Sequence, residues 1–123
     1  MWKFIIRKNA QAKIDYLLKD GSGRVILHSG VYSSDNACRK GIASVTRNSR
    51  TENIEDYTGS TEVPLLKHPK YEIYRAQDGK YWFQLKATNG QVVGLSSSFA
   101  SRENCLEVLE DLREHGHEAI VDD

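Results

Sequence analysis

The feature that most constrains the fold of this chain is an internal duplication. When the sequence is shifted by 67 residues, its halves align without a gap from Lys3 against Lys70 to Thr46 against Arg113. Identical residues meet at Lys3/Lys70, Ile6/Ile73, Lys13/Lys80, Leu18/Leu85, Lys19/Lys86, Gly23/Gly90, Val25/Val92, Ser29/Ser96, Ser34/Ser101 and Cys38/Cys105. Beyond this region a shift of 66 residues matches 52–56 to 118–122, which predicts a one-residue slip after the helix. Two equivalent structural units are therefore expected.

Each copy has the pattern of three strands, a helix and a fourth strand. Alternating apolar residues and turn signals predict strands in the second copy at 71–75, 80–87 and 91–96. The period then becomes helical in both copies, and final strands are expected near 52–57 and 118–122. The unit is β-β-β-α-β, and it occurs twice.

Turn and cap residues support these boundaries. Asn89-Gly90 predicts a tight type I′ hairpin turn, because both residues tolerate the positive φ that such a turn needs. Ser34 and Ser101 precede the helical segments and are the expected N-caps. Gly116 is expected to end the second helix as a C′ residue.

The chain has the size of one domain. Its 123 residues are enough to bury a core without metal or disulfide staples. We expect a single pseudo-symmetric domain over 1–123, with repeats at 1–58 and 71–123 and a proline-containing linker at 59–70. The start MWKFIIRKN has too few apolar residues for a signal peptide or a spanning helix, so we expect a cytoplasmic location.

The segments YEIYRAQDGKYWFQLKATNGQVV (71–93) and GVYSSDNACRKGIASV (30–45) resemble the repeat of the YegP-like family of small bacterial proteins. The resemblance covers nearly the whole chain. It implies an α+β fold in which tandem β(3)-α-β units share one antiparallel sheet, exchange their C-terminal strands and pack their helices on the sheet. It also implies a pseudo-two-fold monomer. It implies no established activity, cofactor or catalytic residue.

Charge is divided unevenly along the chain. Residues 1–50 contain ten Lys and Arg against three Asp and Glu (+7), whereas residues 51–123 contain seven against fourteen (−7). The second helical segment is acidic where the first is basic. This pattern predicts either that the halves neutralise each other within one fold or that the basic first repeat weakly binds nucleic acid.

Strand alternation separates two faces of the expected sheet. Tyr81, Phe83 and Leu85 form the more apolar set and are expected to meet the helices. The opposite face is expected to carry Tyr74, Trp82, Gln84 and Lys86 from the second copy, and Leu17 and Lys19 from the first. A tryptophan on such a face requires a reason. Either Tyr74 or the linker covers it, or these six residues bind an unknown protein or peptide partner.

The sequence contains no clear pattern for a catalytic site or a metal site. His115 and His117 lack a third soft ligand nearby in sequence, so no metal or other cofactor is expected. Cys38 and Cys105 fall on the apolar stripes of their helices, where a thiol acts as a small hydrophobe. Because no combination of acid, base and nucleophile emerges, we expect a non-enzymatic binding module.

Overall fold

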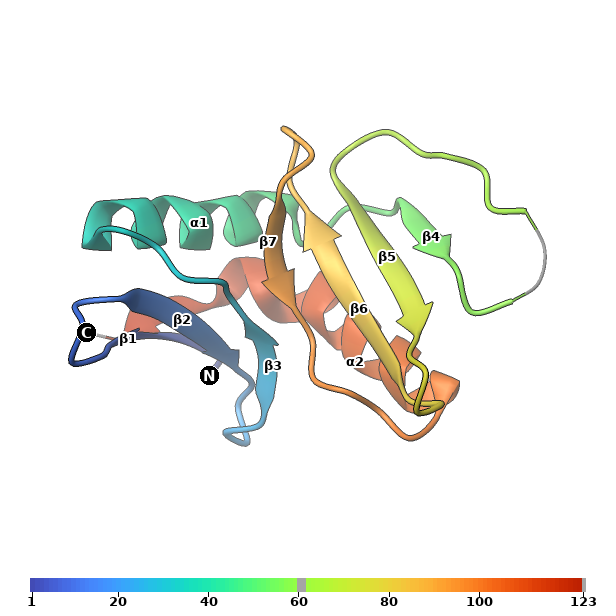
Figure 1. Ribbon diagram of the computed structural model, residues 1–123, viewed down its shortest axis with the longest axis horizontal. Coiled ribbons are helices and arrows are strands. Elements are labelled where there is room, and N and C mark those ends of the chain that lie inside the picture. Colours follow the sequence, from blue (N-terminus) through green and yellow to red (C-terminus); the bar gives the residue numbers. More distant parts are fainter. Residues whose placement is uncertain (60–61, 123) are drawn as a thin grey trace.

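The computed structural model describes residues 1–59 and 62–122, and its elements follow the expected order (Figure 1). The strands are β1 (Lys3–Lys8), β2 (Ile14–Lys19), β3 (Val25–His28), β4 (Ile54–Asp56), β5 (Lys70–Arg75), β6 (Tyr81–Lys86), β7 (Val92–Leu95) and β8 (Ile120–Asp122). The helices are α1 (Asp35–Asn48) and α2 (Arg102–His115), and the short 3-10 helix η1 (Gly116–Glu118) follows α2. β5 thus includes Lys70, which the sequence assigned to the linker.

The described strands form one sheet of eight strands in the order β4-β5-β6-β7-β3-β2-β1-β8. β4, from the first copy, pairs with β5 of the second, while β8 pairs with β1 of the first. The exchange of C-terminal strands and the α+β fold are therefore confirmed. The two halves join where β3 meets β7 in the centre of the sheet.

The resemblance implied a fully antiparallel sheet, but two of the strand pairs are parallel. Both exchanged strands pair in parallel with their neighbours, β4 with β5 and β8 with β1. The physical reason lies in the connections. Hairpins force neighbouring strands to be antiparallel, whereas β4 and β8 each follow a helix, which can return the chain in the parallel direction.

The expected one-residue slip after the helix is wrong. Glu55 lies opposite Glu72, and Asp122 lies opposite Ile5. Since Ile5 and Glu72 are 67 residues apart, Glu55 and Asp122 are structural counterparts at the same offset. Pairing with the neighbouring strand, rather than similarity of residues, sets the register of the last strand.

The hairpin at Asn89-Gly90 is confirmed, but its turn type is not I′. Only Gly90 has positive φ (82°), and its N–H donates to the carbonyl of Ala87 at 2.9 Å, so one glycine closes a three-residue loop. The β1–β2 loop of the first copy has Ala12 at φ 61°, where the second copy has Gly79 at φ 84°. Ala12 therefore occupies a backbone conformation that favours glycine.

Both helix N-caps are confirmed. The hydroxyls of Ser34 and Ser101 accept from the N–H groups of Ala37 and Asn104 at 3.0 and 3.1 Å. Gly116 ends α2 with a φ of −58°, so it is not the left-handed residue that was expected. A Cβ at Gly116 would lie 2.8 Å from Leu112 Cδ1, which shows that close packing excludes a side chain there.

The helices cover one face of the sheet and leave the other without a helix (Figure 1). As predicted from alternation, Phe83 and Leu85 are fully buried on the helix side. The core also contains Phe4, Tyr16, Leu18, Ile26, Leu27, Cys38, Val45, Tyr71, Ile73, Cys105, Leu109 and Leu112. We call the helix-free side the open face. In the described part of the chain, no helix is long and apolar enough to cross a membrane.

Candidate functional site

The six residues predicted for the open face do lie on it, in two groups. Tyr74 is directly opposite Trp82, and β6 carries Trp82, Gln84 and Lys86 together. Leu17 and Lys19 lie on β2, which β7 and β3 separate from β6. Cross-strand pairing nevertheless joins the groups, because Gln84 lies opposite Leu95, Leu95 opposite His28, and His28 opposite Leu17.

A row of three stacked aromatic rings stands at the β4 end of the open face. The Tyr74 and Trp82 ring centroids are 4.8 Å apart with an interplanar angle of 25°. Tyr57, just after β4, stacks on the other side of Tyr74 at 5.2 Å and 7°. These separations match the spacing of neighbouring strands, so the rings stand side by side and face one another. The row therefore turns ring edges outward.

Tyr74 thus accounts for part of the burial of Trp82, as the structural alternative predicted. Trp82 is half-buried rather than enclosed. Because Tyr74 stacks on the β5 side, the second face of the Trp82 indole is turned toward β7. Among the described residues, no second aromatic ring stacks on that face.

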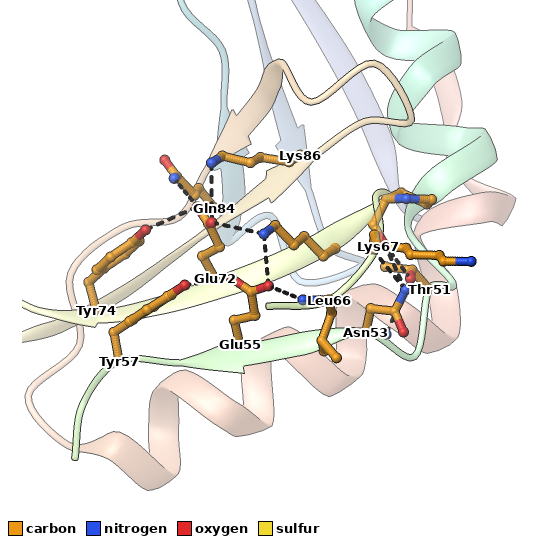
Figure 2. A network of polar contacts seen from close by, with 12 residues as sticks. Thr51, Asn53, Glu55, Tyr57, Leu66, Lys67, Glu72, Tyr74, Gln84 and Lys86 are labelled. Atoms are coloured by element: carbon orange, nitrogen blue, oxygen red, sulfur yellow. Dashed lines mark hydrogen bonds and ion pairs between the residues drawn. The ribbon is translucent and has the colours of Figure 1, made fainter. Parts of the chain in front are cut away.

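Beside the aromatic row lies a buried network of charged side chains (Figure 2). Glu55 and Glu72 sit on neighbouring strands with exposed fractions of 0% and 3%, and Lys70 between them is 6% exposed. Lys70 Nζ is 2.7 Å from Glu55 Oε2 and 3.7 Å from Glu72 Oε2. The cation between the two buried carboxylates offsets their mutual electrostatic repulsion and part of the cost of burying their charges.

Hydrogen bonds complete the network. Glu55 accepts from the hydroxyl of Tyr57 at 2.6 Å and from the backbone N–H of Leu66 in the linker at 2.6 Å. Glu72 accepts from the Tyr74 hydroxyl, the Gln84 amide and the Lys86 ammonium at 3.0, 2.6 and 3.1 Å. The network therefore fixes two rings of the aromatic row and holds the linker over the end of the open face.

The protonation of these groups follows from their partners. Burial alone would raise the pKa of Glu55, but hydrogen bonds from Leu66, Lys70 and Tyr57 outweigh it and lower this pKa to about 2. The bond to Glu55 raises the pKa of Tyr57 to about 12. Burial, followed by the bond to Glu72, raises the pKa of Tyr74 to about 12. At neutral pH both carboxylates are ionised and both phenols are neutral.

The pseudo-two-fold counterpart of this region is built differently. Lys3 and Asp122, the counterparts of Lys70 and Glu55, are 3.9 Å apart and about half exposed, with side-chain exposures of 47% and 53%. Arg7 and Asp15, which form an ion pair at 2.8 Å, replace Tyr74 and Trp82. The aromatic row and the buried network thus belong to one half of the open face only.

Sequence reasoning missed Tyr57, Glu55, Lys70 and Glu72. Alternation along 70–75 places Lys70 and Glu72 on the same face as Tyr74, so that signal was present. Glu55 and Tyr57 come from the other copy, and only the strand exchange brings them beside β5. No local pattern in the sequence could reveal that neighbourhood.

The other candidate groups lie in less reactive surroundings. Cys38 and Cys105 are fully buried, and burial raises the pKa of both thiols, that of Cys105 to about 11. His115 and His117 lie within 4 Å of Glu118. In the residues that the structure describes, however, no three metal-ligating side chains gather.

The cations of the first half are partly neutralised by acids. Arg7 pairs with Asp15, and Arg24 pairs with Asp20 at 3.1 Å. Arg24 also reaches Asp111 in α2 at 3.6 Å. Together with Lys3–Asp122, this contact joins basic and acidic halves within one fold. Some of the positive charge considered for nucleic acid is therefore used internally.

Comparisons with known proteins agree with this architecture. Residues 9–56 and 76–123 each match the model for a domain of unknown function (DUF1508). The chain is 31% identical over 120 residues to the UPF0339 protein YegP of Escherichia coli strain K12, covering 98% of this chain and 94% of the relative. It is 31% identical over 121 residues to the UPF0339 protein PA0329 of Pseudomonas aeruginosa, with 98% and 96% covered.

Two solved structures share the fold. The solution NMR structure of yegP from E. coli, a protein of unknown function, matches with a TM-score of 0.77 at 29% identity, over 99% of this chain and 91% of the other. That of the UPF0339 protein SO3888 from Shewanella oneidensis gives a TM-score of 0.79 at 27% identity, over 98% and 90%. The chain therefore belongs to the YegP-like family, with two copies of the DUF1508 domain.

Proposed function

We propose that this protein is a small interaction module that binds a protein segment on the open face, with Trp82 as the anchor. The observation that carries the proposal is the position of Trp82. It stands half-buried at the inner end of a stacked aromatic row, on the face that the helices leave uncovered. A partly exposed tryptophan held in a rigid row on an uncovered sheet face is typical of a protein-binding surface.

The rigidity of the anchor supports this proposal. The rings of Tyr57 and Tyr74 are fixed through their hydroxyls to Glu55 and Glu72, and Trp82 stacks on Tyr74. Tryptophan and tyrosine dominate the binding energy of protein interfaces. An anchor that is already ordered in the free protein loses little entropy on binding.

The charges of this face favour a protein over nucleic acid. The carboxylates of its described strands each pair with a cation of the same face: Glu55 with Lys70, Glu72 with Lys86, Asp15 with Arg7 and Asp122 with Lys3. A phosphate backbone would gain little from such a balanced surface. The aromatic rings stack on one another, so a base could stack only at the two ends of the row.

We expect the footprint to extend across the sheet. Leu95 and His28 lie directly between Gln84 and Leu17, and Lys19 is two residues further along β2. A partner seated on Trp82 would therefore reach the second group of predicted residues by following this row. We infer a binding role rather than a catalytic one, because the two thiols are buried and their pKa values are raised.

Quenching of tryptophan fluorescence tests whether Trp82 is available. Trp2 is the other tryptophan of the chain, so a Trp2→Phe background isolates the signal of Trp82. Acrylamide should quench this emission partly, and less when a partner is bound. An indole that acrylamide cannot reach in the free protein would remove the basis of the proposal.

Binding itself is tested by affinity capture followed by reconstitution with a purified partner segment. Trp82→Ala should abolish binding, whereas Asp15→Ala, at the pseudo-symmetric position of β2, should leave it nearly unchanged. The interaction should also depend weakly on salt. Binding that survives Trp82→Ala and falls steeply with salt would instead support the nucleic-acid alternative through the basic first repeat.

A further inference from the structure

A cleft of about 230 Å³ lies between α1 and the β6–β7 hairpin, where the two copies meet. It is distinct from the aromatic row. Its walls are formed by residues of both copies: Tyr32, Ala37, Lys40, Gly41 and Ser44 from the first, and Asn89, Gln91, Val92 and Val93 from the second. A ligand in this cleft would therefore touch both repeats at once.

The internal duplication supplies a natural comparison for this cleft. At the equivalent place between α2 and the β2–β3 hairpin, the counterparts of Gln91 and Ser44 are Arg24 and Asp111. Arg24 Nη2 lies 3.6 Å from Asp111 Oδ2, so this pair bridges the hairpin and the helix. The cleft between α1 and the β6–β7 hairpin, called the first cleft below, has no such bridge, because Gln91 and Ser44 stand at these two positions.

A second difference makes the wall of the first cleft more polar. Gly41 in α1 corresponds to Val108 in α2, and Tyr32 corresponds to Phe99. A Cβ at Gly41 would lie 2.1 Å from the Tyr32 hydroxyl, so the phenol lies directly against the bare helix backbone. The glycine thus makes room for a hydroxyl in the cleft wall, where the other copy has two apolar side chains.

The wall beneath this hydroxyl is firmly held. The Tyr16 hydroxyl donates to the carbonyl of Val93, which ties β2 of the first copy to β7 of the second. The ring of Tyr16 stacks on Tyr32 with centroids 6.4 Å apart and an angle of 20°. In the second copy Phe83 replaces Tyr16 and has no hydroxyl to make this bond. The wall of the first cleft formed by Tyr32 and Val93 is therefore held in place.

The chemistry of the lining selects an anion. Lys40 supplies a positive charge, and the hydroxyls of Tyr32 and Ser44 and the amides of Asn89 and Gln91 can donate hydrogen bonds. None of the described residues that line the cleft carries a carboxylate. In α2, by contrast, the position of Lys40 holds Glu107. Where the counterpart site holds the Arg24 guanidinium of the first copy against Asp111 of the second, this cleft presents hydrogen-bond donors without a carboxylate.

We propose that this inter-repeat cleft binds a small oxyanion, a carboxylate or phosphate group of a small molecule. Lys40 supplies the ionic contact, and Ser44 and Gln91 donate hydrogen bonds from opposite walls. Val92 and Val93 provide an apolar side that suits a short aliphatic tail. The volume of about 230 Å³ lies below the range of pockets for drug-sized ligands, which favours a small ligand over a nucleotide or a peptide.

The test is an NMR titration of the full-length protein with inorganic phosphate and, separately, with butyrate, at constant ionic strength. The backbone signals of Gly41, Ser44 and Gln91 should shift and saturate. Lys40→Gln should weaken binding by at least about tenfold, the effect of losing a charge-assisted bond. Lys13→Gln removes an equal charge from an exposed loop position and should leave binding unchanged.

A second variant copies the bridging ion pair of the counterpart site into the proposed cleft. Ser44→Asp combined with Gln91→Arg recreates the Asp111–Arg24 pair. The double variant should abolish the ligand-induced shifts, while the rest of its spectrum remains that of a folded protein. Saturation by phosphate alone would identify the ligand group as phosphate, and saturation by butyrate alone as carboxylate.

Two results would overturn the proposal: shifts that do not saturate, or equal weakening of binding by Lys40→Gln and Lys13→Gln. Either result would mean that the protein attracts anions only in a general, non-specific way. Because Lys40 is exposed, its replacement leaves the core intact. The outcome for this variant therefore remains decisive even if the double variant does not fold.

Discussion

Replacing Lys70 with methionine would remove the charge between Glu55 and Glu72 while keeping most of the aliphatic side chain. Both carboxylates are almost fully buried, and Lys70 Nζ is 2.7 Å from Glu55 Oε2. Removing one partner of a buried ion pair leaves an uncompensated charge, which typically costs 3–5 kcal/mol. We expect the lower end, about 3 kcal/mol, because Glu55 keeps its bonds from Leu66 and Tyr57.

The pKa of Glu55 reflects all of its partners together, and Lys70 is one of them. A fall from 4.5 to about 2 corresponds to about 3 kcal/mol of preferential stabilisation of the ionised form in the folded state. Since the folded pKa lies below the unfolded one, this stability is present above about pH 4.5 and is lost as the pH falls toward 2. The cost of Lys70→Met should therefore be larger at pH 7 than at pH 3.

The fold itself provides the matched control. Lys3 is the structural counterpart of Lys70 and lies 3.9 Å from Asp122 in a half-exposed pair. Lys3→Met should cost less than about 1 kcal/mol, because water screens an exposed pair. Urea unfolding of both variants at pH 7 and pH 3 measures the two costs.

Equal costs for Lys70→Met and Lys3→Met, or a cost of Lys70→Met that does not change with pH, would refute this reasoning. The double variant Glu55→Gln/Lys70→Met adds a further check. It should be more stable than Lys70→Met alone, because it leaves no ionised carboxylate at position 55 without its cation.

Three further predictions concern the backbone, the strand exchange and the thiols. Ala12→Gly should stabilise the protein by about 0.5–1 kcal/mol and Gly79→Ala should destabilise it by about 1 kcal/mol, since both positions have positive φ; equal signs in thermal unfolding would contradict this. A fragment of residues 1–58 should not give a dispersed monomeric NMR spectrum, because β4 pairs with β5 rather than within its own copy; a folded monomer in sedimentation would show the exchange to be dispensable. Cys38 and Cys105 should react with a thiol reagent at neutral pH far more slowly in the native protein than in urea, and fast native labelling would reopen the case for thiol chemistry.

Much of the fold could be predicted because its signals are local. The match of Lys3–Thr46 to Lys70–Arg113 established the repeat, and alternation in β6 separated Phe83 and Leu85 from Trp82. Such patterns are readable because side chains two residues apart in a strand, or four apart in a helix, share a face. Ser34 and Ser101 were recognisable as caps because a serine just before a helical segment can accept from a backbone N–H of the first turn.

Details that depend on neighbours distant in sequence were mistaken. The similarity of 52–56 to 118–122 suggested a slip of one residue, but pairing with β5 and β1 keeps the offset at 67. The sequence also did not indicate that β4 and β8 pair in parallel with their neighbours. Nor did it indicate that Gly116 has a right-handed helical φ. In each case a contact with another element, rather than a residue's own preference, decides the conformation.

By itself, the sequence determined that two like units occur and which side of each central strand carries Trp82. Only the tertiary structure decided that Glu55 and Tyr57 of one copy meet Lys70 and Tyr74 of the other. It also decided that one inter-repeat cleft stays open while an ion pair bridges its counterpart. The physical reason is that periodicity acts within a segment, whereas charge compensation and stacking act between segments whose proximity exists only after folding.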